Sequence, residues 1–267
     1  MNIKLLKTTA ILLILAGCFS SCSKQEQTLN DIDSEINIRM VEIFDKSPRT
    51  FQFVCSTEKI YPCCNYSIKT ESRQSSKKID VSFKGVIEHY ICLTAIGPAT
   101  AYIDLGALSE GTYNLNLSYG DVKQSGQLLV SSDSYKVNFR NKSAFKFTNA
   151  PLNKIPEHTI WGNICYHTKE TSSLVQSFVT ALTKLGAEKK PYLPGNYNEF
   201  EIDKNGNIVQ PGENSGCWFA QSFIFHFSGN VANIEQLVKQ YARDYGTEYM
   251  YISIYTEKGE KLLSWMY

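Results

Sequence analysis

The sequence lacks an excess of charge of either sign. Its 267 residues include 27 basic and 26 acidic side chains, which leaves a formal net charge of +1. A nucleic-acid-binding protein needs a basic surplus on one face, so the composition predicts no nucleic-acid partner. Also missing are the glycine-rich fingerprints of phosphate and dinucleotide sites and the G-x-S-x-G elbow of serine hydrolases. Apolar residues still make up 43% of the chain, which argues against a mainly disordered protein.

The N-terminus has the pattern of an export signal. A basic start with two lysines precedes an apolar stretch over residues 8–16, which is too short for the roughly 20 residues that span a bilayer. The Leu15-Ala16-Gly17-Cys18 run that follows resembles the lipobox of bacterial lipoproteins. This resemblance implies cleavage before Cys18, a diacylglyceryl group on its thiol and acylation of the new amine, for example by palmitate. The alternative is an ordinary secretory signal with an accidental cysteine.

Cys22 is a second candidate for lipid attachment, because the run SCSK around it resembles the junctions of Bacteroidota lipoproteins. The Leu-Ala-Gly box favours Cys18. With either cysteine, two or three acyl chains hold the protein stably to a membrane. We therefore expect a signal peptide over 1–17, a flexible polar tether over 18–35, and a place in the cell envelope at the outer membrane, on its periplasmic or its outer side.

The other cysteines predict disulfides, because an even number in an exported chain permits them. These cysteines are Cys55, Cys63, Cys64, Cys92, Cys165 and Cys217. A bond between the adjacent Cys63 and Cys64 would be strained, so their available partners are Cys55 and Cys92. In the second half, Cys165 has only Cys217 nearby. The alternative is that some of the six are buried thiols, which pack as small hydrophobes.

Residues 36–140 predict an antiparallel β-sandwich. Apolar and polar residues alternate in several short stretches that are separated by turn residues, which indicates seven or eight strands. The run 108–120 resembles the closing hairpin of Ig-like modules in bacterial surface proteins, which implies an Ig-like fold. Residues 61–71 and 92–101 resemble a domain of Bacteroidota lipoproteins to which no activity is assigned.

Two prolines, Pro151 and Pro156, and the loss of periodicity predict a linker over 141–158. From residue 159 to 267 the pattern is that of an α+β domain with two amphipathic helices, and a hairpin is expected around an Asn-Gly turn at 205–206. The expected order β-α-β-β-β-α-β-β predicts a ferredoxin-like, two-layer α+β sandwich. The fold class is therefore mainly β, followed by α+β.

Catalytic and metal-binding motifs are weak in this chain. Cys165, His167, Cys217 and His226 would supply the ligand types of a zinc site or a thiol-protease pair, but their spacing matches neither. Asp203 begins a partial calcium-loop pattern in which the glycine comes too early, so a hairpin turn is favoured. We therefore expect no metal, no cofactor and no catalytic residue.

Aromatic side chains crowd the C-terminal part and provide a candidate binding surface. Tyr249, Tyr251 and Tyr255 share one face of an expected strand, while aliphatic residues occupy the other face. If the aliphatic face meets the helices, the tyrosines lie on the outer side of the sheet, where they can contact a ligand or simply pack on other parts of the protein.

The sequence thus predicts a non-catalytic binding or structural module that contacts a protein or glycan through its C-terminal sheet. One alternative is a hydrolase of envelope or nutrient polymers with a site between the domains. Another is a structural subunit that forms a homodimer through the tyrosine face.

Overall fold

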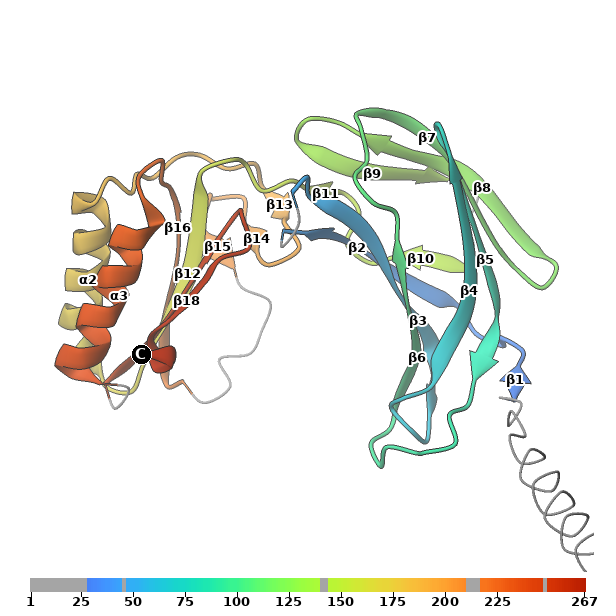
Figure 1. Cartoon of the computed structure of the whole chain (residues 1–267), viewed down its shortest axis with the longest axis horizontal. Coiled ribbons are helices and arrows are strands. Elements are labelled where there is room, and N and C mark those ends of the chain that lie inside the picture. Colours follow the sequence, from blue (N-terminus) through green and yellow to red (C-terminus); the bar gives the residue numbers. More distant parts are fainter. Residues whose placement is uncertain (1–27, 45–46, 140–143, 210–216, 247–248) are drawn as a thin grey trace, which may run out of the picture.

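A computed structural model describes residues 28–44, 47–139, 144–209, 217–246 and 249–267. The chain is mainly β, with two sheets and two helices in this described part (Figure 1). The expected signal peptide, 1–17, and both candidate acylation sites, Cys18 and Cys22, lie outside it. Among the described helices, none has the length and apolar character needed to cross a bilayer.

The larger sheet folds back on itself, so that two of its parts face each other. The first layer contains, in spatial order, β10 (Phe145–Phe147), β2 (Ile36–Ile43), β3 (Thr50–Tyr61) and β6 (Gly97–Asp104). The second layer contains β4 (Ser67–Ser75), β5 (Lys78–Ile87), β7 (Gly111–Tyr119), β8 (Val122–Val130) and β9 (Ser134–Phe139), with β1 (Leu29–Asn30) beside β5. A narrow extension continues from β9 through β11 (Leu152–Asn153), β13 (Gly195–Asn196), β14 (Glu201–Ile202) and β15 (Ile208–Val209).

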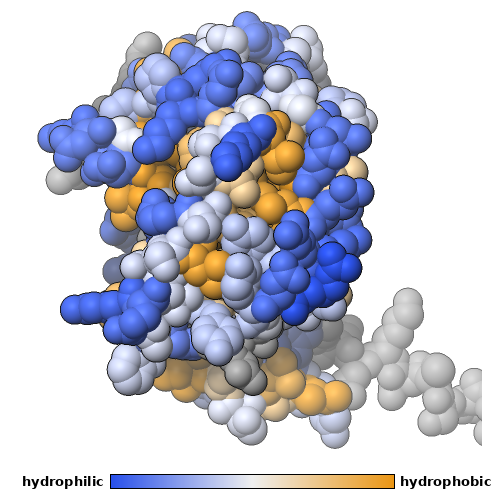
Figure 2. All heavy atoms as spheres, turned by 90° about the vertical axis from the view of Figure 1, so that its left-hand side faces the viewer, coloured by the Kyte–Doolittle hydropathy of each residue, from blue (hydrophilic) through white to orange (hydrophobic). Residues whose placement is uncertain are grey.

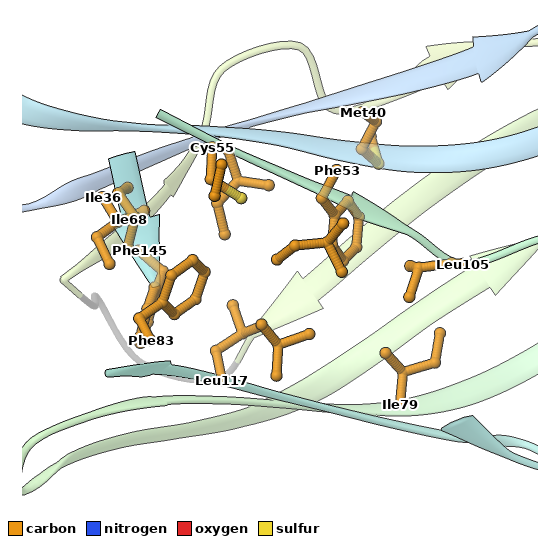
Figure 3. Packing of buried hydrophobic residues seen from close by; sticks show 14 of the residues in the cluster. Ile36, Met40, Phe53, Cys55, Ile68, Ile79, Phe83, Leu105, Leu117 and Phe145 are labelled. Atoms are coloured by element: carbon orange, nitrogen blue, oxygen red, sulfur yellow. The ribbon is translucent and has the colours of Figure 1, made fainter. Parts of the chain in front are cut away.

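Period-two alternation puts one side of each strand into a shared apolar core. Met40 and Phe53 of the first layer face Ile79 and Leu117 of the second (Figure 3), and all four are at most 1% exposed. The layers are not purely antiparallel as expected, because β5 pairs with β7 and β10 with β2 in parallel. Parallel neighbours need a crossover, and local alternation carries no signal of which strands a crossover joins.

Residues 28–35, the described end of the expected tether, contact the sandwich. β1 pairs with β5, and Lys59 forms an ion pair with Asp33. In the described part of the expected linker over 141–158, β10 and β11 pair with other strands and bury Phe145 and Leu152.

The three apolar cores and both disulfides are formed by residues after Thr28.

The second sheet has the order β16 (Phe219–His226), β12 (Thr159–Tyr166), β17 (Met250–Thr256), β18 (Lys261–Leu263), and every pair is antiparallel. The helices α2 (Ser172–Lys184) and α3 (Val231–Tyr245) cover one face of it (Figure 1), and short 3-10 turns, η1 (Lys169–Thr171) and η2 (Ser264–Met266), complete this part. The aliphatic side of β17 packs on the helices as expected.

The helix ends differ in how they are stabilised. Asn230 caps α3, because its Oδ1 accepts a hydrogen bond from the Ala232 amide at 3.0 Å, and Gly246 ends the helix with a positive φ of 66°. Ser173 and Gln176 have the spacing of a capping box in the sequence, but they do not cap α2. The described helix starts at Ser172, and Gln176 donates instead to Gln221 on β16, at 2.7 Å.

The second sheet does not have the expected ferredoxin-like order. Its elements run β-α-β-α-β-β, since the hairpin β14–β15 joins the first sheet instead. The turn of that hairpin is a type I turn with Gly206 at a φ of 80°, in which the Gly206 amide donates to the Asp203 carbonyl. Asp203 also accepts hydrogen bonds from the Asn205 and Asn207 amides, which explains its resemblance to a calcium loop.

The cysteines form one disulfide in each half of the chain, Cys63–Cys92 and Cys165–Cys217. Cys55 and Cys64 are free thiols, which corrects their place among the disulfide candidates. Cys55 points into the sandwich core (Figure 3), where burial raises its thiol pKa to about 12, whereas Cys64 is exposed in the turn after β3. The second disulfide also removes the two thiolates that a zinc site would need.

Candidate binding cleft

A cleft of about 1020 Å³ lies where one end of the sandwich meets the C-terminal part of the chain. The end of β2 and the start of β3 supply one wall, with Glu42 and Arg49. His158, Tyr192 and Glu257 supply the opposite wall. The residues of one wall are more than 100 positions away in the sequence from those of the other wall, so only the folded chain brings the two walls together.

A buried acid anchors the sandwich wall. Glu42 is 6% exposed; its Oε1 accepts a hydrogen bond from the Tyr135 hydroxyl at 3.1 Å, and its Oε2 lies 3.5 Å from Arg49 Nη1. Burial raises the pKa of the Glu42 carboxyl, and the charge of Arg49 and the Tyr135 hydrogen bond offset this only in part. Arg49 Nη1 also donates to the Ile155 carbonyl at 2.7 Å, which ties this wall to the segment after β11.

Lys154 and Asp133 place opposite charges beside this acid. The Lys154 ammonium donates to the Ser131 carbonyl and lies 4.7 Å from the centre of the Tyr135 ring, a cation–π distance. Asp133 Oδ1 accepts hydrogen bonds from the Ser131 and Ser134 hydroxyls, and these bonds lower the pKa of the Asp133 carboxyl. The sandwich wall therefore offers fixed charges of both signs.

The opposite wall combines an acid with an aromatic ring. Glu257 is 7% exposed, and its Oε1 accepts a hydrogen bond from the His158 amide at 3.0 Å. His158 has a φ of 59°, a left-handed conformation that turns the chain just before β12. Tyr192 is half-buried; its hydroxyl lies 3.4 Å from Thr159 Oγ1, and burial raises its pKa.

An aromatic cluster beneath the cleft holds the two walls in place. Trp161 of β12, 3% exposed, lies edge-on to Phe44 at 6.1 Å and near Phe200 at 5.5 Å between ring centroids. Phe200 in turn stacks on Tyr197. Phe44 comes from the end of β2, and Phe200 precedes the hairpin β14–β15 that joins the first sheet. The cluster thus connects the sandwich, the hairpin and the second sheet.

The tyrosines predicted as one binding surface have different surroundings in the structure. Tyr255 is half-buried and stacks on Trp161 in the cluster below the cleft. Tyr251, on the same face of β17, lies edge-on to His167 and to Trp265 of η2. Tyr249 precedes β17 and is 55% exposed. The face is therefore partly covered by the chain itself, as the alternative interpretation of these tyrosines allowed.

The cleft residues were missed at the sequence level, although one of them had a readable signal. Glu42 follows Ile36, Ile38 and Met40 at alternate positions, so it occupies the core-facing side of β2. A charged residue on an apolar face indicates a buried partner or a site. Nothing local identifies Tyr135, which contacts Glu42 from 93 positions away.

Most of the acidic groups in this cleft are bonded within the protein. Four acidic side chains line the cleft, and three of them, Glu42, Asp133 and Glu257, already accept hydrogen bonds from the protein. A general acid or base needs a carboxyl that can reach its substrate. Within the described ranges, no group of three or more His, Cys, Asp and Glu side chains is arranged to hold a metal.

Comparison with known proteins gives no relative of this chain. No protein-family model, no curated protein and no solved structure matches it. Its function is therefore inferred from the geometry of the described residues.

Proposed function

We propose that this protein is a lipid-anchored, non-catalytic binding protein of the cell envelope, and that a short glycan binds in the cleft. The sequence of the N-terminus supports the anchor, with Cys18 or Cys22 as the acylated residue. The sandwich is proposed as an Ig-like domain and the C-terminal part as a separate α+β domain, which makes the cleft an interdomain site. Such boundaries are a common place for ligand sites.

The single observation that carries the proposal is the composition of the cleft walls. Small-molecule sites enclose about 300–1000 Å³ and combine apolar surface with a few fixed polar groups. This cleft is of that size, at about 1020 Å³, and sets Phe44 and Tyr192 among Asp133, His158 and Lys258. Sugar rings have an apolar face that packs on aromatic rings and hydroxyls at their edges that bond to charged groups. Both parts of a sugar ring thus find complementary chemistry in the cleft.

The two alternative functions receive less support from the same residues. A hydrolase needs an accessible pair of carboxyl groups, whereas Glu42 and Glu257 are buried and hydrogen-bonded within the protein. Of the two exposed acids of the cleft, Asp133 is held by two serine hydroxyls, which leaves Glu157. A homodimer through the tyrosine face needs that face to be open, whereas Tyr255 is covered by the aromatic cluster.

A glycan array probed with the chain from Thr28 to Tyr267 tests the proposal. We expect Tyr192→Ala to weaken binding by about tenfold or more, because a central aromatic contact is worth more than 1 kcal/mol. Tyr251→Ala, on the second sheet outside the cleft, is the matched control and is expected to leave binding unchanged.

Three results would contradict the proposal. Loss of binding in Tyr251→Ala alone would show that the glycan binds at the tyrosine face and not in the cleft. Absence of any glycan ligand would show that the ligand is not a glycan. Release of shortened glycans would show a hydrolase instead of a binding protein.

A further inference from the structure

Six large apolar side chains are exposed together at the end of the sandwich that lies away from the cleft. Four belong to the loop between β5 and β6, where Tyr90 is 86%, Ile91 71%, Leu93 53% and Ile96 75% exposed. Leu29 of β1 and Ile60 at the end of β3, 47% and 55% exposed, complete the group, which we call the base patch. Apolar surface also follows the lower edge of the molecule in Figure 2, the side on which β1 lies in Figure 1.

The exposed loop is fixed in position by several bonds. The Cys63–Cys92 disulfide joins it to the turn after β3. Asn65 then bonds to it on both sides of Cys92, since its Nδ2 donates to the Ile91 carbonyl at 2.6 Å and its Oδ1 accepts from the Leu93 amide at 3.3 Å. Ile91 and Leu93 are therefore held in solvent by the fold. Large exposed apolar groups that are held rigidly mark an interaction surface.

The chain enters the fold directly beside this loop. Leu29 pairs with Ile87, and the Glu88 amide donates to the Thr28 carbonyl at 3.4 Å. Glu88 is the residue from which the exposed loop starts. If Cys18 carries the lipid, ten residue steps separate it from Thr28, so Thr28 lies within about 34 Å of the anchored cysteine even when the intervening chain is fully extended. For Cys22 that distance is about 20 Å.

We propose that the base patch inserts into the lipid surface of the membrane to which the N-terminus is attached. The inference rests on the proposed lipid anchor and adds a second point of membrane contact. Of all the described surface, this end is the part that the short N-terminal connection brings nearest to the bilayer. Exposed aromatic and aliphatic side chains are the groups that settle at the boundary between lipid head groups and acyl chains.

The charges around the patch favour apolar insertion over electrostatic attraction. Among the described residues, an ion pair between Lys59 and Asp33 lies next to the patch, and Glu58 and Glu88 add negative charge nearby. A surface that binds anionic lipid head groups would instead carry a cluster of lysines and arginines. Membrane contact through this patch is therefore expected to survive high salt.

Flotation with vesicles of phosphatidylethanolamine and phosphatidylglycerol tests the proposal, using the unacylated chain from Thr28 to Tyr267. We expect it to float with the vesicles, and to do so equally in 0.1 M and 1 M salt. The triple variant Ile91→Ser, Leu93→Ser, Ile96→Ser is expected to lower the partition coefficient at least tenfold. The matched control is Tyr102→Ser, Val122→Ser, Leu129→Ser, which removes exposed apolar groups from β6 and β8 and is expected to change it less than twofold.

Hydrogen exchange on the full acylated chain in the same vesicles provides the second measurement. Protection of residues 88–96 that is absent in the triple variant would support insertion. Failure of the unacylated chain to float, or equal flotation of the triple variant, would overturn the proposal. A wild-type dimer that the triple variant converts to a monomer in sedimentation would also overturn it, because the patch would then join two copies.

Mass spectrometry separates this inference from the anchor on which it rests. An acyl mass on Cys18 or Cys22 without flotation of the unacylated chain would refute insertion of the base patch and support the lipid anchor. Flotation without an acyl mass would refute the lipid anchor and support insertion of the base patch.

Discussion

Glu42 is the residue at which the sandwich and the cleft are most directly linked. Its carboxyl is buried, yet it stands at the end of β2 where the cleft begins. Arg49 and Tyr135 are its partners, but neither compensates fully for the lost water, since burial is the largest influence on its pKa and raises it. Ionisation of Glu42 therefore lowers the stability of the folded state.

We predict a pH-dependent effect of Glu42→Gln on stability. The pKa of Glu42 is raised in the folded state, so between its unfolded value and its folded value the folded protein holds more protons than the unfolded one. The contribution of Glu42 to stability is thus fully present below the unfolded pKa and is lost as the pH rises through the folded pKa. Glutamine has no such loss, and it can still accept the hydrogen bond from Tyr135.

Urea denaturation at a series of pH values measures the effect. The free energy of unfolding of Glu42→Gln, relative to the wild type, is expected to increase from pH 4 to pH 8. A difference that stays constant, or that falls with pH, would show that Arg49 more than compensates for burial. Glu201→Gln, at an exposed position of β14, is the control for the substitution itself.

The inward direction of Glu42 was readable from the sequence, but its partners were not. The alternation that starts at Ile36 fixes which side of β2 faces the core. Arg49 and Tyr135 reach Glu42 only because the end of β2 lies beside the starts of β3 and β9, and that depends on tertiary structure. For the same reason the sequence could not identify the disulfide partner of Cys63. Cys55 and Cys92 were both available, and only the folded structure shows that Cys92 is the partner.

At the scale of single elements, β12 leaves little room for change at its centre. It is paired on both sides, with β16 and β17, and Gly162 sits in its middle. A Cβ at Gly162 would collide with the Ser253 carbonyl oxygen and would approach the Phe223 ring to 2.8 Å. Because the Ser253 oxygen is backbone in a neighbouring strand, it cannot move aside without shifting the sheet.

We therefore predict that Gly162→Ala lowers the free energy of unfolding by about 1–3 kcal/mol, the usual cost of overpacking a core. Ser253→Ala, which only removes a hydroxyl on the neighbouring strand, is the control and is expected to cost less than about 0.5 kcal/mol. Chemical denaturation of both variants measures the difference. Equal stabilities would mean that β12 and β17 separate more easily than their register suggests.

Element types followed from the sequence more reliably than their pairing. Period two gave the strands of residues 36–140, and period 3.6 with Asn230 and Gly246 gave α3. The expected pairing was wrong for strands that are joined by long connections. β5 pairs with β7 in parallel, and the hairpin β14–β15 joins the first sheet instead of the second. Hydrophobic alternation states which side of a strand is buried and carries no information on which strand lies beside it.

At the scale of the whole molecule, the cleft and the base patch lie at opposite ends of the sandwich. β3 begins with Thr50 beside the cleft and ends at Tyr61 near the Cys63–Cys92 disulfide, a span of about 36 Å at 3.3 Å per residue. If the base patch rests on the membrane, the cleft faces away from it. The sandwich then acts as a spacer that presents the binding site to soluble ligands.

Such a spacer needs a firm connection between the sandwich and the C-terminal sheet, and the aromatic cluster provides it. Phe44 from the end of β2 and Phe200 from the loop before β14 contact the Trp161 ring from different parts of the chain. Phe200 is 1% exposed, so Phe200→Ala is expected to lower the free energy of unfolding by about 3–5 kcal/mol. Phe44, which is only partly buried, is expected to contribute less.

Because both rings act on Trp161, we predict that the two substitutions are not additive. A double-mutant cycle with Phe44→Ala and Phe200→Ala, measured by urea denaturation, is expected to give an interaction energy of about 0.5–3 kcal/mol. The control cycle pairs Phe44→Ala with Phe178→Ala, a substitution in the separate core between α2 and the second sheet, and is expected to be additive within about 0.5 kcal/mol. Additivity in both cycles would mean that the cluster does not couple the two parts. The cleft would then lie between parts that move independently, and its walls could not hold a glycan in one fixed geometry.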